Sequence, residues 1–90
     1  MTELTDAELL EAAARGERDA LGRIARRYVV FVYNAALRQV HDDKHLAEDV
    51  TQAVFVILSR KVHRLKRGTL LHGWLFTTCL LYTSPSPRDS

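Results

Sequence analysis

The feature that most constrains this chain is the spacing of its apolar residues, which recur every three to four positions along three successive segments. Such spacing places apolar side chains on one side of an α-helix, whereas the strict alternation typical of a strand is absent. In the segment expected over about residues 18–40, the apolar positions are Leu21, Ile24, Ala25, Tyr28, Val32, Ala35 and Ala36. The sequence therefore predicts an all-α fold, a small helical bundle of three long helices plus a truncated fourth.

Local capping signals set the bounds of these helices. Thr5 and Glu8 have the spacing of a capping box, and Gly16 suits the left-handed residue that often ends a helix. The polar break at residues 41–45 supplies an aspartate as N-cap for a third helix, which we expect over about residues 44–61.

The third helix is expected to present two different sides. Its inward stripe comprises Leu46, Val50, Ala53, Val54, Ile57 and Leu58. On the opposite side fall Glu48, Gln52 and Ser59, with Asp49, Phe55 and Val56 at the margins.

In the second helix, residues 29–33 are apolar nearly all round, so we expect neighbouring helices to cover them on several sides.

Length and composition exclude several classes of protein. Ninety residues suffice for one domain, and no apolar run approaches the roughly 20 residues of a membrane span. The acidic N-terminus lacks the basic and apolar regions of a secretory signal. The lone cysteine, Cys79, cannot form a disulfide framework, so we expect a cytoplasmic protein.

Charge is distributed unevenly along the chain. Residues 1–49 carry seven Lys or Arg against ten Asp or Glu, whereas residues 50–78 carry five Lys or Arg and no acid. This polarity suggests two faces with different partners, one of them polyanionic. A solvated helix end is the alternative, because cations also favour helix C-termini.

The end of the chain departs from the helical pattern. Residues 62–73 hold the basic cluster and two glycines, which predicts a loop or broken helix before an apolar segment that begins at Trp74. From Cys79 the helical spacing is lost and the chain becomes rich in Ser and Pro. We therefore expect a helical domain over residues 1–78, truncated in its fourth helix. Residues 79–90 would be a tail that either resembles a translated sequencing adapter or is an authentic disordered segment.

Catalytic and metal-binding patterns are weak. His41 and His45 have a spacing that suits one metal ion, but no third ligand is evident. His72 and Cys79 make a poor nucleophile pair. We expect neither enzyme activity nor a metal or cofactor, although a metal-dependent helical enzyme using His41, His45 and acidic residues stays an alternative.

Residues 45–55, HLAEDVTQAVF, closely resemble region 2.2 of bacterial RNA polymerase sigma factors of the extracytoplasmic-function (ECF) group. The resemblance extends over residues 5–78 and implies a helical domain that binds core RNA polymerase and opens the promoter minus-ten element. Its other supporting segments are Gly16-Glu17-Arg18, Arg27-Tyr28, Val32-Tyr33 and Gly73-Trp74-Leu75.

The resemblance implies a polymerase-binding face on the third helix, which would contact the clamp helices of the largest polymerase subunit. Its residues would be Glu48, Asp49, Gln52, Phe55 and Val56. Apolar contact would supply affinity there, and charge would set the register. Compensation of the helix dipole is the alternative role for the two carboxylates.

The resemblance also implies contact with the non-template strand of promoter DNA. The DNA-binding residues would be Arg60, Lys61, His63, Arg64, Lys66, Arg67 and Trp74. Such cations position a phosphate backbone but specify little sequence. For Trp74 itself we favour an inward, core position over a DNA contact, since a large apolar side chain at a helix start commonly packs inward.

The expected function is thus that of a sigma factor domain in transcription initiation, with an anti-sigma factor as a further partner whose identity the sequence does not give. The alternative is a helical protein–protein interaction module without DNA binding. That module would use the third helix but leave the cations of residues 60–67 without a role.

Overall fold

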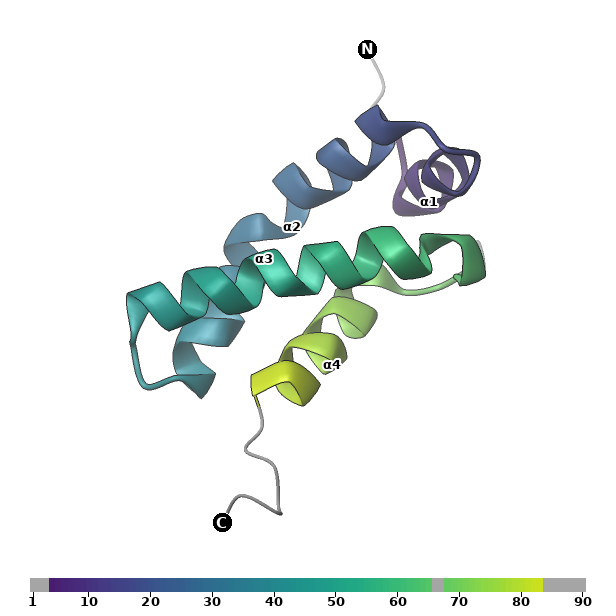
Figure 1. Cartoon of the computed structure of the whole chain (residues 1–90). Coiled ribbons are helices and arrows are strands. Elements are labelled where there is room, and N and C mark those ends of the chain that lie inside the picture. Colours follow the sequence, from purple (N-terminus) through teal and green to yellow (C-terminus); the bar gives the residue numbers. More distant parts are fainter. Residues whose placement is uncertain (1–3, 66–67, 84–90) are drawn as a thin grey trace.

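A computed structural model of the chain describes residues 4–65 and 68–83. Within these residues the structure is helical and contains no strand, so the predicted all-α fold is confirmed. The elements are α1 (Asp6–Ala14), α2 (Arg18–Gln39), α3 (Lys44–Lys61), the 3-10 turn η1 (Val62–Arg64) and α4 (Leu71–Thr83). The long helices α2 and α3 cross each other, α4 packs against both, and α1 packs against α2 and η1 (Figure 1).

The first helix has the caps that its sequence predicts. The Thr5 hydroxyl accepts a hydrogen bond from the Glu8 amide at 3.2 Å, and the Glu8 carboxylate accepts one from the Thr5 amide at 2.8 Å. This reciprocal pair satisfies two amide donors at the start of the helix. Gly16 follows the helix with a φ of +96°, a conformation that disfavours residues with a Cβ. The capping box and the terminal glycine are both confirmed.

The connection between α2 and α3 is short and sharply turned. His41 and Asp42 both have positive φ, at 57° and 65°. Asp43 then acts as N-cap of α3, its carboxylate accepting a hydrogen bond from the Leu46 amide at 3.1 Å. The expected bounds of α3, residues 44–61, are those observed.

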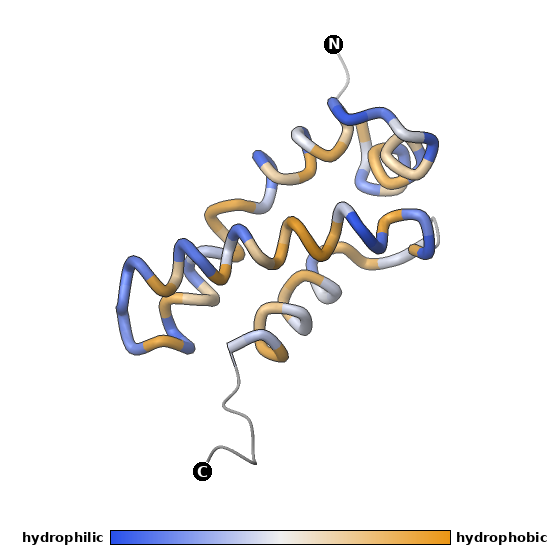
Figure 2. The backbone as a smooth tube through the Cα atoms, viewed as in Figure 1, coloured by the Kyte–Doolittle hydropathy of each residue, from blue (hydrophilic) through white to orange (hydrophobic). Residues whose placement is uncertain are grey.

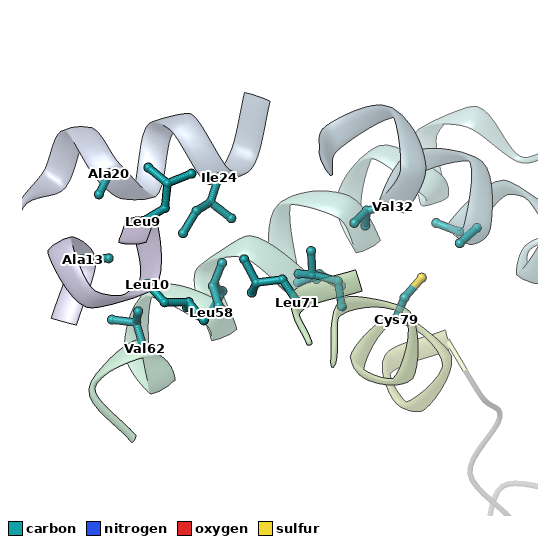
Figure 3. Packing of buried hydrophobic residues seen from close by; sticks show 14 of the residues in the cluster. Leu9, Leu10, Ala13, Ala20, Ile24, Val32, Leu58, Val62, Leu71 and Cys79 are labelled. Atoms are coloured by element: carbon teal, nitrogen blue, oxygen red, sulfur yellow. The ribbon is translucent and has the colours of Figure 1, made fainter. Parts of the chain in front are cut away.

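The hydrophobic core lies between the helices and is formed by buried side chains from all four of them. Figure 3 shows Leu9 of α1 beside Ile24 of α2, and Leu10 beside Leu58 and Val62. Each of these five side chains is at most 2% exposed. Full burial of a leucine or isoleucine contributes about 1.5–3 kcal/mol, so the short helix α1 is anchored mainly by its two leucines.

The buried stripe of α3 differs from the predicted stripe. Leu46, predicted to be inward, is 46% exposed, whereas Ala47 and Thr51 are buried. The buried stripe is rotated toward Ala47 and Thr51, and Thr51 lines a hollow together with Val29, Val30 and Tyr33 of α2. Leu46 instead borders a hollow beside Tyr82, in the last turn of α4. The hydroxyl of Thr51 donates to the Ala47 carbonyl at 2.7 Å, which satisfies this buried polar group within its own helix.

The fourth helix begins earlier and extends further than predicted. It starts at Leu71, not at Trp74, because Leu71 is buried in the core. It also continues past Cys79 to Thr83, so the predicted loss of helical structure from residue 79 is wrong for residues 79–83. Cys79 is 0% exposed, and burial raises the pKa of its thiol. The rest of the predicted tail, residues 84–90, lies outside the described residues.

None of the helices in the described part of the chain combines the length and hydropathy of a membrane span.

Candidate functional site

The outward face of α3 carries polar side chains that its packing leaves in solvent. Glu48, Asp49 and Gln52 are all exposed. Val50, Val54 and Leu58 of the same helix are buried. Figure 2 shows the corresponding alternation of hydrophilic and hydrophobic residues along α3. The predicted division of this helix into a polar and an apolar side is therefore confirmed for these positions.

A hollow between α2 and α3 adjoins this face, and we call it the α2–α3 groove. Its volume is about 330 Å³. Its lining residues are Val29, Val30, Tyr33, Glu48, Thr51 and Gln52. The groove therefore combines an apolar wall on α2 with a carboxylate and an amide on α3.

Two residues of the groove overturn the expectation that residues 29–33 are covered. Val29 is 41% and Val30 67% exposed, although Val32 is fully buried. The other helices pack on the remaining sides of α2 and leave this strip in solvent. Exposed apolar side chains beside polar ones are typical of protein interaction surfaces.

The other residues predicted to bind polymerase lie around α3 outside this groove. Asp49 borders a separate hollow of about 270 Å³ together with Leu46 and Tyr82. Val56 is 49% exposed, and Phe55 is half-buried against the core. The structure thus brings only Glu48 and Gln52 together with the apolar wall of α2.

The cations predicted to bind DNA gather where α3 ends. Arg60 and Lys61 lie exposed in its last turn, and Arg64 lies exposed in η1. His63 is exposed too, and its Nδ1 donates a hydrogen bond to the Ala14 carbonyl at 3.0 Å, which ties η1 to the end of α1. These four residues are the basic end of the molecule. Lys66 and Arg67 lie outside the described residues.

Trp74 is half-buried and packs against the core. Its remaining surface borders a hollow of about 340 Å³ between α3 and α4, which Ile57 and Lys61 also line. The indole therefore has a packing role and also lies in the same hollow as a cation of the basic end.

A cluster of rings on α2 and α4 was not predicted. The rings of Phe31 and His72 are stacked with centroids 4.0 Å apart, and Phe76 lies 6.3 Å from Phe31. Tyr28 adjoins both Phe31 and His72 at 6.4 Å. His72 and Phe76 are exposed, so the cluster reaches the surface. Tyr28 and Phe31 are three residues apart on α2, and His72 and Phe76 are four residues apart on α4, so each pair lies on one side of its helix. The packing of α2 against α4 brings the two pairs together.

The parts of the chain that the structure describes hold no group of three or more His, Cys, Asp or Glu side chains placed to bind a metal ion. His41 and His45 are both exposed at the turn before α3.

An exposed polar face beside apolar side chains, together with a basic end, is typical of domains that bind other macromolecules. A model of the sigma-70 region 2 family matches residues 23–79, which is more than half of the chain, and the chain belongs to this family. Domains of this family bind RNA polymerase and take part in promoter melting, and the family is not one of enzymes. Searches of curated proteins and of solved structures found no significant match.

Proposed function

We propose that this chain is region 2 of an ECF-group sigma factor, which docks core RNA polymerase through α3 and contacts the minus-ten element through its basic end. The observation that carries the proposal is the exposure of Glu48, Asp49 and Gln52 on a helix whose opposite side is buried. The ECF assignment rests on the resemblance of residues 45–55 to region 2.2 of that group.

Docking would use the α2–α3 groove as its centre. Val29 and Val30 supply apolar surface that a partner helix can bury, while Glu48 and Gln52 supply a charge and an amide that fix its register. The partner would be the clamp helices of the largest polymerase subunit. Asp49, Phe55 and Val56 would contact the same partner around the rest of α3.

DNA contact would begin at the basic end. Arg60, Lys61 and Arg64 are exposed and can neutralise phosphates of the non-template strand, with release of counterions. Unpaired bases usually stack on aromatic side chains, and the exposed rings of His72 and Phe76 provide such a surface. Binding that favours the unpaired strand would shift the promoter toward its open state without any chemical step.

A sigma factor acts where polymerase and chromosome are, so we place the protein in the cytoplasm. An anti-sigma factor that covered the α2–α3 groove or the basic end would compete with polymerase or with DNA.

Co-purification with core RNA polymerase tests the docking proposal. The full chain carrying Asp49→Lys together with Gln52→Ala should no longer co-purify, because the variant reverses one charge and removes one amide of the docking face. Asp19→Lys is the matched control, since Asp19 is an exposed acid on α2 outside the groove. Circular dichroism should show unchanged helicity in both variants. If the double variant co-purified as well as the control, the docking proposal would be wrong.

A further inference from the structure

A second basic site lies between α1 and α2, apart from the basic end. A hollow of about 470 Å³ there is lined by Leu4, Leu9, Arg23, Arg26 and Arg27. The three arginines follow a spacing of three and four residues, which places their side chains on neighbouring positions of one helix face. The basic-end proposal gives these arginines no role.

Two of the three guanidinium groups already have acidic partners. Arg27 donates to the Asp6 carboxylate and to the Leu4 carbonyl, both at 2.8 Å. The Nε of Arg23 lies 3.2 Å from the Asp19 carboxylate, in a pair whose side chains are more than half exposed. An exposed pair of this kind contributes little free energy, so an anion can displace Asp19.

Arg26 differs from the other two arginines. Among the residues that the structure describes, its guanidinium makes no hydrogen bond and no ion pair. Its Nη1 lies 3.7 Å from the position that a Cβ would occupy at Gly22, so it lies over the preceding turn of α2. The absence of a side chain at Gly22 leaves space beside this guanidinium. Among the described residues, three arginines line the hollow, and the Arg26 guanidinium has no carboxylate partner there.

We propose that this arginine pocket binds a phosphate group. A guanidinium offers a planar set of donors that matches phosphate oxygens, and arginine is the residue that proteins favour for this purpose. The oxygens of a phosphate are arranged tetrahedrally, and the unesterified ones, in a phosphodiester as in a terminal phosphate, can accept hydrogen bonds from Arg23 and Arg26 at once. The phosphate belongs either to a nucleic acid strand or to a free nucleotide. The site does not depend on the promoter contacts proposed above.

Titration of the full chain with sodium tripolyphosphate at constant ionic strength tests the site. The Nε–Hε signals of Arg23 and Arg26 in NMR spectra should shift and saturate. Arg26→Gln should weaken the affinity about tenfold or more, the usual effect of losing a charge-assisted hydrogen bond. Arg38→Gln is the control, because Arg38 is exposed near the other end of α2 and outside the pocket. It should leave the affinity unchanged.

Competition then identifies the source of the phosphate. Displacement of tripolyphosphate by a short single-stranded oligonucleotide, at lower concentration than by a nucleoside triphosphate, would assign the site to nucleic acid. The reverse order would assign it to a free nucleotide. Shifts that do not saturate, or equal affinities of the Arg26→Gln and Arg38→Gln variants, would overturn the proposal. Loss of promoter DNA binding in an Arg60→Gln and Arg64→Gln variant that still binds tripolyphosphate would show that the two sites are separate.

Discussion

The hydroxyl of Tyr28, on α2, donates a hydrogen bond to the carboxylate of Asp6, in the first turn of α1. The same carboxylate accepts a hydrogen bond from Arg27 at 2.8 Å. An isolated helix of nine residues is barely stable in water, so α1 depends on its contacts with the rest of the bundle. These polar contacts, together with Leu9 and Leu10, fix α1 on α2.

Replacing Tyr28 by Phe should lower the free energy of unfolding by about 1 kcal/mol. The change removes one hydrogen bond to a charged group, but Asp6 keeps its bond from Arg27. Urea denaturation measures the effect. Tyr82→Phe is the matched control, because the exposed Tyr82 ring should leave stability within about 0.5 kcal/mol. Equal stabilities of the two variants would show that the Asp6 contact does not support the fold.

Ionisation of the Tyr28 hydroxyl should lower the stability of the protein in alkaline solution. Burial first, and then the hydrogen bond and charge of Asp6, raise the pKa of Tyr28 from 10.0 to about 12. A raised pKa in the folded state stabilises the protein below the unfolded pKa, and this stabilisation is lost as pH rises from about 10 toward about 12. Thermal unfolding of the wild type and of Tyr28→Phe across this range measures the difference. The gap between the two melting temperatures should narrow as pH rises, and a constant gap would contradict the assignment.

The core contact between α1 and α3 should be worth more than any surface contact. Leu58→Ala should lower the free energy of unfolding by about 2–5 kcal/mol, because the side chain is 1% exposed and its removal leaves a cavity. Leu70→Ala makes the same chemical change at a residue that is 80% exposed, and it should change stability by less than about 0.5 kcal/mol. Chemical denaturation measures the free energy of unfolding of both variants. Similar decreases in the two variants would show that Leu58 is not part of the core.

Binding of single-stranded promoter DNA should weaken steeply with salt. Each phosphate that a cation neutralises contributes about 0.7 to the slope of log affinity against log salt concentration for a single strand. Arg60→Gln and Arg64→Gln should therefore each flatten the slope by up to about this amount, whereas Arg38→Gln should not. Fluorescence anisotropy at several salt concentrations measures the slopes. A slope near zero for the wild type would refute phosphate contact at the basic end.

The fold was predictable where local chemistry determines it. The ends of α1 are set by Thr5, Glu8 and Gly16, through hydrogen bonds and backbone geometry that involve only neighbouring residues. Asp43 does the same for the start of α3. The bounds of α4 were not predictable in this way, because its residues are apolar on nearly every side and carry no clear amphipathic period. Burial of Leu71 against other helices decides where it begins.

The candidate site was predictable only in part, for a related reason. The exposure of Glu48 and Gln52 follows from the periodicity of a single helix. The exposure of Val29 and Val30 does not, because an apolar residue on a central helix is covered or left in solvent according to where its neighbours pack. The stacking of Phe31 on His72 likewise requires two segments about 40 residues apart in the sequence to meet.

Site-specific photo-cross-linking tests the central claim, that the outer face of α3 is the polymerase-binding surface, most directly. A photoreactive residue in place of Gln52 should cross-link the largest subunit of core RNA polymerase, because Gln52 is exposed at the α2–α3 groove. The same residue in place of Arg18, exposed at the start of α2 and outside that groove, should give no cross-link above background. Cross-linking from position 18 but not from position 52 would contradict the account.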